Sequence, residues 1–194
     1  MPADAYIHIE LRTAVGCWAA RHASLLKGDF VKCGVNTGVM SLAICEYLDF
    51  NSIDKRFFMF DNYEWIPLSQ INEVEAAMDR ASDKEYDFNS YELLKRNFSP
   101  YPRVKLIKGV VPDSFVGLDI ESVTYLSIDM NIAYPESASI GYFWPKLTAG
   151  AIVLLDDYGW LGYDEQKKVM NDFAAKHGTE VLTLLIGQGL LLKP

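Results

Sequence analysis

Two alternating sequence periods constrain the fold of this chain of 194 residues more than any other feature. From residue 29 onward, short β-branched or aromatic runs alternate with longer stretches in which apolar residues recur every three or four positions. This alternation is typical of βαβ units, in which helices cover a mostly parallel sheet. The length corresponds to roughly one domain. We therefore predict a single α/β domain over residues 1–194.

Seven runs are predicted to form the sheet. Five are expected to be parallel, at residues 29–33, 56–60, 104–108, 123–128 and 151–155. Two more, Glu180–Ile186 and Leu190–Lys193, are joined by Gly187-Gln188-Gly189. A loop this short favours an antiparallel hairpin, because a parallel return needs about a dozen residues or more. The predicted sheet is therefore mostly parallel and closes with an antiparallel C-terminal pair.

The first 28 residues are predicted to form an amphipathic helical arm. Leu11, Val15, Trp18 and Ala19 fall on one face at helical spacing. This face could pack on the body of the domain or on a second copy of the chain, so it is the candidate contact of a homo-oligomer.

The stretch between the second and third strands is more polar and is predicted to be an inserted helical segment. Ser69 is the expected N-cap of a helix whose inner face carries Ile71, Val74 and Met78.

Composition narrows the range of partners. Lysine and arginine number 18 against 26 acidic residues, which gives a formal net charge of −8. This balance opposes general binding to nucleic acid or to an anionic membrane. Three cysteines are too few for a disulfide framework, and the first residues lack the pattern of a secretory leader. We expect a cytoplasmic protein that acts on a small molecule.

Polar residues follow the predicted strands at their carboxyl ends, where open α/β sheets bind ligands. The turn after the first strand contains Gly34, Val35, Asn36 and Gly38, and it serves either cofactor binding or close packing of a helix on its strand. Asp61 ends the second strand, where a carboxylate can accept hydrogen bonds from both hydroxyls of a ribose. Its alternative role is that of a turn cap.

Three aspartates are predicted to converge at the same edge. Asp129 follows the fourth strand, and Asp156 and Asp157 follow the fifth. Neighbouring strands lie about 5 Å apart, so the carboxylates can meet, and their mutual repulsion calls for a positive partner. Carboxylate oxygens suit a hard divalent ion such as Mg²⁺. In the alternative, one aspartate caps a helix and another is solvated.

Five stretches together resemble the S-adenosylmethionine-dependent O-methyltransferases of the macrocin O-methyltransferase family. They are GDFVKCGVNTG, FMFDNYEWIP, KLIKGVVPDSF, LSIDMNIAYPES and FWPKLTAGAIVLLDDYG, and the resemblance covers about Leu25 to the end. It implies a class I methyltransferase fold, which is a Rossmann-like three-layer sandwich with seven strands. The implied activity is methyl transfer to a hydroxyl of a sugar or related small molecule.

The resemblance also implies roles for particular residues. The turn from Gly34 to Gly38 holds the methionine end of the cofactor, Asp61 holds its ribose, and Val110 and Val111 border its adenine. The full implied cofactor set is Gly34, Val35, Asn36, Gly38, Asp61, Asn62, Val110, Val111, Asp113 and Asp129. The implied Mg²⁺ ligands are Asp129, Asp156 and Asp157.

Two positions differ from the family pattern. Lys32 stands where the family has an acidic residue, and Asn131 stands where its sugar-modifying members have an aspartate proposed as general base. Asp129 and Asn131 are the catalytic candidates, although an asparagine cannot take a proton. Two alternatives therefore stay open: a catalytically impaired cofactor-binding or assembly protein of the same fold, and a different Rossmann enzyme that uses a nucleotide cofactor.

Overall fold

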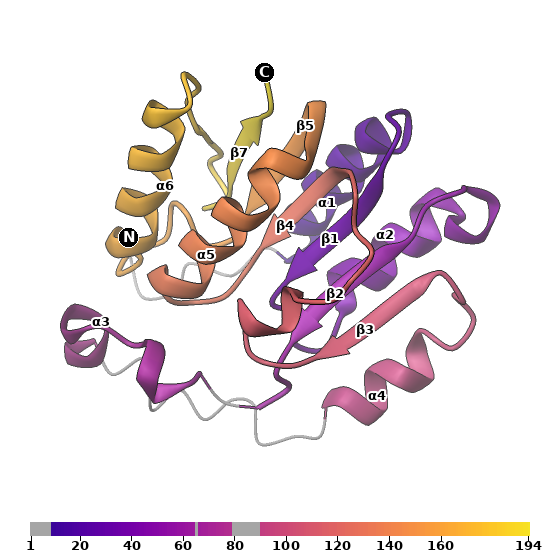
Figure 1. Ribbon diagram of the computed structural model, residues 1–194, viewed down its shortest axis with the longest axis horizontal. Helices are drawn as coiled ribbons and strands as arrows, with labels where there is room; N and C mark the ends of the chain where they lie inside the picture. The colour runs from indigo at the N-terminus through magenta and orange to yellow at the C-terminus, as the bar shows by residue number, and fades with distance from the viewer. Residues whose placement is uncertain (1–8, 65, 79–89) are drawn as a thin grey trace.

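A seven-stranded sheet organises the chain in the computed structural model, which describes residues 9–64, 66–78 and 90–194 (Figure 1). The strand order is β3-β2-β1-β4-β5-β7-β6, with β1 to β5 parallel and β7 antiparallel to both of its neighbours. This confirms the predicted mixed sheet with its antiparallel C-terminal pair. The strands are β1 Asp29–Cys33, β2 Phe57–Asp61, β3 Val104–Lys108, β4 Val123–Ile128, β5 Leu147–Leu155, β6 Leu182–Thr183 and β7 Gly189–Leu192.

Two strands differ from their predicted lengths. β5 begins at Leu147 rather than at residue 151, because Leu147 pairs with Val123 before an irregularity in the register with β4. β6 has only two residues, since Leu184 and Gly187 already form the turn into β7. The apolar pattern of both runs predicted strands but could not place the points where pairing starts and stops.

Helices cover both faces of the sheet in three layers. Alternate strand residues point to opposite faces and form two separate cores. Phe30, Met59 and Leu154 face α1 (Ile9–Ser24), α2 (Val39–Leu48) and α4 (Ser90–Asn97). Val31, Phe60 and Val153 face α5 (Ala133–Phe143) and α6 (Asp164–Lys176), which lie in front of the sheet in Figure 1.

Helix α1 buries a different face from the one predicted. Leu11 and Trp18 are 51% and 58% exposed, whereas Ala19 is buried as expected. The other buried positions are Arg12, Gly16, Ala20 and Ala23. The small residues of this face let the helix backbone approach the sheet closely, so that a Cβ added at Gly16 would lie 3.7 Å from Ile44 and from the Tyr125 hydroxyl. Close packing of small side chains outweighs the larger apolar residues here.

The inserted segment also begins differently. Helix α3 (Glu73–Ala77) is capped by Asn72, whose Oδ1 accepts from the Glu75 N–H at 2.9 Å while Glu75 Oε2 accepts from the Asn72 N–H at 3.1 Å. Ser69 lies in a 3₁₀ turn instead, so its predicted capping role is wrong. The buried residue of α3 is Glu75, and the predicted inner face is largely exposed. Figure 1 shows α3 apart from the three layers, beyond the carboxyl ends of the parallel strands.

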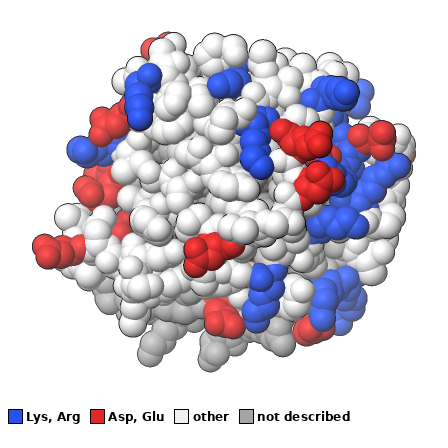
Figure 2. All heavy atoms as spheres, in the orientation of Figure 1, with Lys and Arg blue, Asp and Glu red and all other residues white. Residues whose placement is uncertain are grey.

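Charged groups of both signs share the surface. On the face drawn in Figure 2, lysines and arginines lie among aspartates and glutamates. None of the helices within the described residues is both long and apolar enough to span a bilayer.

The packing of α1 predicts opposite outcomes for two substitutions. Ala20→Leu, at a fully buried position, should lower the free energy of unfolding by about 1–3 kcal/mol, because the added volume has no space between helix and sheet. Trp18→Ala should change it by less than about 0.5 kcal/mol, as expected for an exposed position. Urea denaturation measures both. A larger loss of unfolding free energy for Trp18→Ala than for Ala20→Leu would indicate that the predicted face of α1 is the buried one.

Candidate active site

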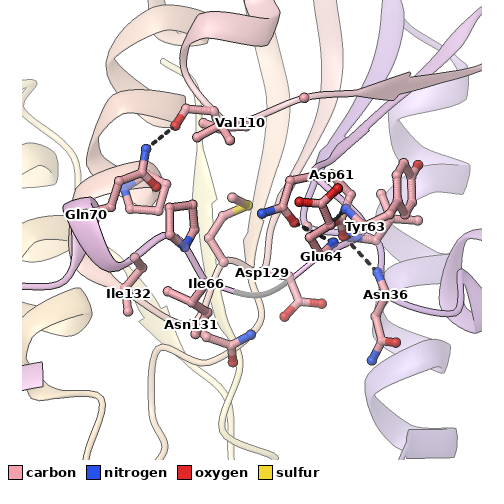
Figure 3. A pocket seen from close by; sticks show the side chains of 18 of the residues that line it. Asn36, Asp61, Tyr63, Glu64, Ile66, Gln70, Val110, Asp129, Asn131 and Ile132 are labelled. Atoms are coloured by element: carbon pink, nitrogen blue, oxygen red, sulfur yellow. Dashed lines mark hydrogen bonds between the residues drawn. The ribbon is translucent and has the colours of Figure 1, made fainter. Parts of the chain in front are cut away.

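A pocket opens at the carboxyl ends of β1, β2 and β4. Asn36 and Tyr63 lie at one end of it and Gln70 and Ile132 at the other, with Asp129 between them in Figure 3. Strand ends, the β1 to α2 turn and the inserted segment all contribute to its walls. The lining residues are Gly34, Val35, Asn36, Asp61, Asn62, Tyr63, Glu64, Ile66, Pro67, Gln70, Ser90, Gly109, Val110, Val111, Asp129, Met130, Asn131, Ile132 and Pro135.

Gly34 brings the ends of β1 and β4 into close contact. Its φ is 82°, and a Cβ built there would lie only 1.7 Å from the carbonyl oxygen of Asp129. Because no side chain fits in that space, the backbone itself forms the floor of the pocket beside Asp129. The close approach of β1 and β4 therefore requires this glycine, and the same backbone lines the pocket, so the packing role and the cofactor role both stay open.

Asp61 fixes the turn and also faces the pocket. Its Oδ2 accepts hydrogen bonds from the backbone N–H groups of Val35 at 2.7 Å and Asn36 at 3.0 Å, and its Oδ1 accepts from Tyr63 N–H at 2.7 Å. The turn-cap alternative is thus correct, but it does not exclude ligand binding. Oδ2 already accepts two N–H groups, whereas Oδ1 accepts one and keeps a second lone pair that can accept from a ribose hydroxyl.

The pocket gathers most, but not all, of the predicted cofactor residues. Gly38 and Asp113 are not in its lining. Gly38 is the N-cap of α2, where a Cβ would lie 2.9 Å from the Phe98 ring, so helix packing accounts for this glycine. Asp113 is exposed at the start of a 3₁₀ turn. Eight predicted residues do line the pocket: Gly34, Val35, Asn36, Asp61, Asn62, Val110, Val111 and Asp129.

The inserted segment is anchored across the pocket by two side chains that the sequence did not single out. Gln70 Nε2 donates to the carbonyl oxygen of Val111 at 2.7 Å. Glu75 Oε1 accepts from the Ala133 N–H at 2.6 Å, in the first turn of α5, where the helix dipole favours a carboxylate. The spacing of Asn72 and Glu75 is that of a capping box, which could have identified the helix but not its anchoring contact.

Asp129, Asp156 and Asp157 meet below the pocket as predicted. One oxygen of each lies within 4.8 Å of the others. Asp129 is half-buried and lines the pocket, whereas Asp156 and Asp157 are only 4% and 8% exposed. Three carboxylates so close together repel strongly unless a positive group lies between them.

Two cations of the chain itself contact this trio. Lys32 Nζ lies 3.0 Å from Asp129 Oδ2. Arg12 Nη2 forms ion pairs with Asp156 Oδ2 and, at 3.3 Å, with Asp157 Oδ1. The sequence analysis missed Arg12. The sequence feature that could have identified it is a single arginine on the small-residue face of the first helix, four positions before Gly16.

Burial dominates the electrostatics of the trio. It raises the pKa of Asp156 to about 6 and that of Asp157 to about 8, and the charge of Asp129 adds to both shifts. Burial likewise raises the pKa of Glu136 in the first turn of α5, whose Oε1 accepts from the Met130 N–H at 3.3 Å. Burial alone would lower the pKa of Lys32, but the carboxylates, Asp129 first, raise it above its ordinary value. The ammonium therefore stays charged.

The trio has the donor chemistry of a magnesium site, but side chains of the chain itself already bind most of its oxygens. Asp156 Oδ2 is bound by Arg12, and Asp156 Oδ1 accepts from Gln188 Nε2 at 2.7 Å. Asp129 Oδ2 is bound by Lys32. Asp157 Oδ2 has no hydrogen-bond partner and Lys32 leaves Asp129 Oδ1 open, so with both cations in place a divalent ion would find two free carboxylate oxygens instead of a complete set.

Asn131 borders the pocket beside Asp129 (Figure 3). Its φ of 63° is left-handed, a conformation that asparagine tolerates better than most residues. Its Oδ1 accepts from the Tyr163 hydroxyl at 3.3 Å. The amide can orient a ligand by hydrogen bonds but cannot remove its proton.

The fold and site define a class of protein. A seven-stranded sheet in this order, with an antiparallel terminal strand, a glycine cradle and an acidic residue after the second strand, is the arrangement of class I methyltransferases. The family model described as Macrocin-O-methyltransferase (TylF) matches residues 11–185. The chain belongs to the macrocin O-methyltransferase family, whose members use S-adenosylmethionine. The family match argues against a different Rossmann enzyme with a nucleotide cofactor.

Solved structures share the fold. The O-methyltransferase NovP superposes with a TM-score of 0.79 at 19% identity, covering 94% of this chain and 79% of that one. The calicheamicin methyltransferase CalS11 gives 0.70 at 17% identity, with 95% and 79% covered. The Podospora anserina methyltransferase PaMTH1, bound to S-adenosylhomocysteine, gives 0.58 at 15% identity, with 93% and 78% covered. Among curated proteins, none matches this chain.

The Gly34 cradle predicts a difference between two glycine substitutions. Gly34→Ala should abolish binding of S-adenosylhomocysteine, because the methyl group would collide with the Asp129 carbonyl. Gly117→Ala is the matched control: its φ of 81° is nearly the same, but nothing lies within 4 Å of the added Cβ. The control should cost about 1–2 kcal/mol of backbone strain and keep binding intact. Calorimetric titration with S-adenosylhomocysteine measures binding, and equal affinities for the two variants would contradict the cradle.

The pKa of Asp157 predicts how stability depends on pH. Its folded value, about 8, lies above its ordinary value of 3.8, so the folded state binds this proton more tightly than the unfolded state. The carboxyl therefore contributes less stability as the pH rises from about 4 through about 8. In Asp157→Asn this titration is absent, so the stability of the variant relative to the wild-type protein should increase with pH over that window. Urea denaturation at several pH values measures the difference, and one that stays constant would contradict the shift.

Proposed function

We propose that this protein transfers the methyl group of S-adenosylmethionine to a hydroxyl of a sugar or related small molecule. Support comes from the pocket in which Gly34, Asp61 and Asp129 converge, because it combines a backbone cradle, a ribose acceptor and a carboxylate in one cavity. The relatives agree in chemistry: NovP is an O-methyltransferase and CalS11 a TDP-rhamnose 3'-O-methyltransferase.

The pocket residues divide into a cofactor end and an acceptor end. We assign the turn Gly34–Asn36 to the methionine moiety, Asp61 and Asn62 to the ribose, and Val110 with Val111 to the adenine. The bound cofactor supplies an electrophilic methyl group on a sulfonium. Asp129 and Asn131 lie toward the acceptor end, where they orient the hydroxyl for in-line attack.

Proton removal falls to Asp129 in this proposal. Its Oδ2 is held by Lys32, which leaves Oδ1 to accept the proton of the acceptor hydroxyl. Asn131 contributes a hydrogen bond only. Magnesium assistance, predicted from the sequence, is not part of the proposal, because Arg12 and Lys32 already supply positive charge to the trio and bind oxygens of Asp156 and Asp129.

A second candidate function follows from Asn131. With an amide where the family's sugar-modifying members have an aspartate, the protein could keep the cofactor pocket and have lost catalysis, serving as a binding or assembly subunit. The exposed Leu11 and Trp18 are its candidate contact surface. A cytoplasmic location and association with a second copy stay predictions.

Binding and turnover together test the proposal. S-adenosylhomocysteine should bind with a dissociation constant between about 1 μM and 1 mM. Labelled methyl groups from S-adenosylmethionine should appear on at least one member of a panel of sugars and nucleotide sugars. Asp129→Asn should reduce that rate by about 10²- to 10⁴-fold.

The variant Asn131→Asp separates the two candidates. A wild-type protein that binds the cofactor but methylates no panel member, together with an active Asn131→Asp, would establish the impaired form. Failure of the wild-type protein to bind S-adenosylhomocysteine at millimolar concentration would remove both candidates.

A further inference from the structure

Each carboxylate of the trio faces a positive side chain of this chain. Asp129 pairs with Lys32, while Asp156 and Asp157 share Arg12. The Arg12 guanidinium also donates to the backbone carbonyl of Asp156 at 3.2 Å. The contacts thus involve both side chains and main chain at the end of β5.

Arg12 is buried and is held by several contacts, although its Nε has no hydrogen-bond partner. It is 7% exposed, and its guanidinium carbon lies 5.6 Å from the centre of the Trp160 ring, within the range of a cation–π contact. Its helix packs through Gly16 and Ala20 directly on the sheet. Gln188 Nε2 donates both to Asp156 Oδ1 and, at 3.5 Å, to the Arg12 carbonyl oxygen. The position of Arg12 in the site is therefore fixed by the packing and hydrogen bonds of the folded protein.

Lys32 is equally fixed. It lies in β1, between β2 and β4, in register with Met59 and Ser127. Its side chain is 3% exposed, and Nζ contacts Ser127 Oγ at 3.4 Å besides Asp129 Oδ2 at 3.0 Å. Burying an ammonium in this way is costly unless acceptors replace its lost water, and here a carboxylate is one of them.

We propose that Arg12 and Lys32 take the place of a divalent ion at the Asp129, Asp156 and Asp157 trio, so that the protein folds and binds S-adenosylmethionine without a metal. This inference rests on the proposed function for the cofactor and deepens it by assigning the counter-charge of the site. The two side chains act as positioning residues, since they hold Asp129 against the pocket.

Competition for the same oxygen atoms supports the proposal. Arg12, Gln188 and Lys32 bind both oxygens of Asp156, Oδ2 of Asp129 and Oδ1 of Asp157, so a divalent ion would have only Asp129 Oδ1 and Asp157 Oδ2 unless it displaced one of these side chains. With both side-chain cations retained, the formal positive charge would exceed that of the three carboxylates by one. The cluster would then be positive directly beside the pocket for a sulfonium, which is also positive. Two internal cations avoid that repulsion.

Metal uptake by the wild-type protein is the first measurement. The full chain is titrated with Mn²⁺ while free Mn²⁺ is followed by electron paramagnetic resonance, and the unfolding temperature is compared in Mg²⁺ and in EDTA. We expect no stoichiometric Mn²⁺ uptake and the same unfolding temperature in both solutions. S-adenosylhomocysteine should bind equally well in EDTA and in Mg²⁺.

The second measurement compares the unfolding temperature and the Mn²⁺ affinity of variants that lack one of the two cations. Arg12→Met and Lys32→Met each leave a carboxylate without its cation, so both should lower the unfolding temperature, and Mg²⁺ should restore part of the loss. Their Mn²⁺ binding should become about tenfold tighter or more. Lys55→Met is the matched control, because Lys55 is also a buried lysine but its Nζ donates to the backbone carbonyls of Gly28, at 2.7 Å, and Leu26. It should destabilise the protein without any gain in metal binding.

The outcomes separate this inference from the proposed function. Uptake of one Mn²⁺ per wild-type chain that Asp156→Asn abolishes would overturn the inference, and so would cofactor binding that requires Mg²⁺. That result decides the question even if Arg12→Met and Lys32→Met fail to fold. Absence of S-adenosylhomocysteine binding under every condition would instead overturn the proposed function. Folded charge-removal variants that gain no metal affinity would also count against the inference.

Discussion

A buried ion network at the carboxyl ends of β1, β4 and β5 is the interaction on which the rest of the site depends. Three aspartates enter it because parallel strands deliver their following residues to one edge, and the dry interior makes their mutual repulsion severe. Arg12 and Lys32 offset that repulsion from opposite sides. The network holds Asp129 at the pocket beside Gly34, and it joins α1 to the end of β5.

Local patterns were sufficient to predict most of the sheet. β1, β3 and β4 occupy the predicted residues, because each is a short β-branched or aromatic run with clear ends. The antiparallel pair followed from a loop too short for a crossover. The early part of β5 and the short β6 were not predictable, because their limits depend on which neighbours they pair with. The small-residue face of α1 was missed since close packing, unlike hydrophobicity, has no strong signature in one helix.

The site residues likewise fall into those that the sequence predicted and those that it did not. Asp61, Asp129 and the Asp156–Asp157 pair were predicted because they follow strands directly. Arg12 and Glu75 were not, since each acts at a distance: Arg12 contacts residues 144 positions away, and Glu75 contacts the start of α5 58 positions away. Predicting such contacts requires the relative placement of helices that the periodicity alone does not give. Gly38 is the converse case: this motif residue lies outside the pocket lining, and contact with Phe98 is enough to require a glycine there.

The ion pair between Arg12 and Asp156 has a consequence for how this sequence can vary. Position 12 lies in α1, far from Asp156 and Asp157 in the sequence. A neutral residue there would nevertheless leave these two buried carboxylates without their cation. Loss of Arg12 should therefore cost less stability when an acid of the pair is lost with it. If the arginine were lost and both acids kept, only another cation could balance the cluster, so one side chain of α1 bears on whether these strand ends call for a metal.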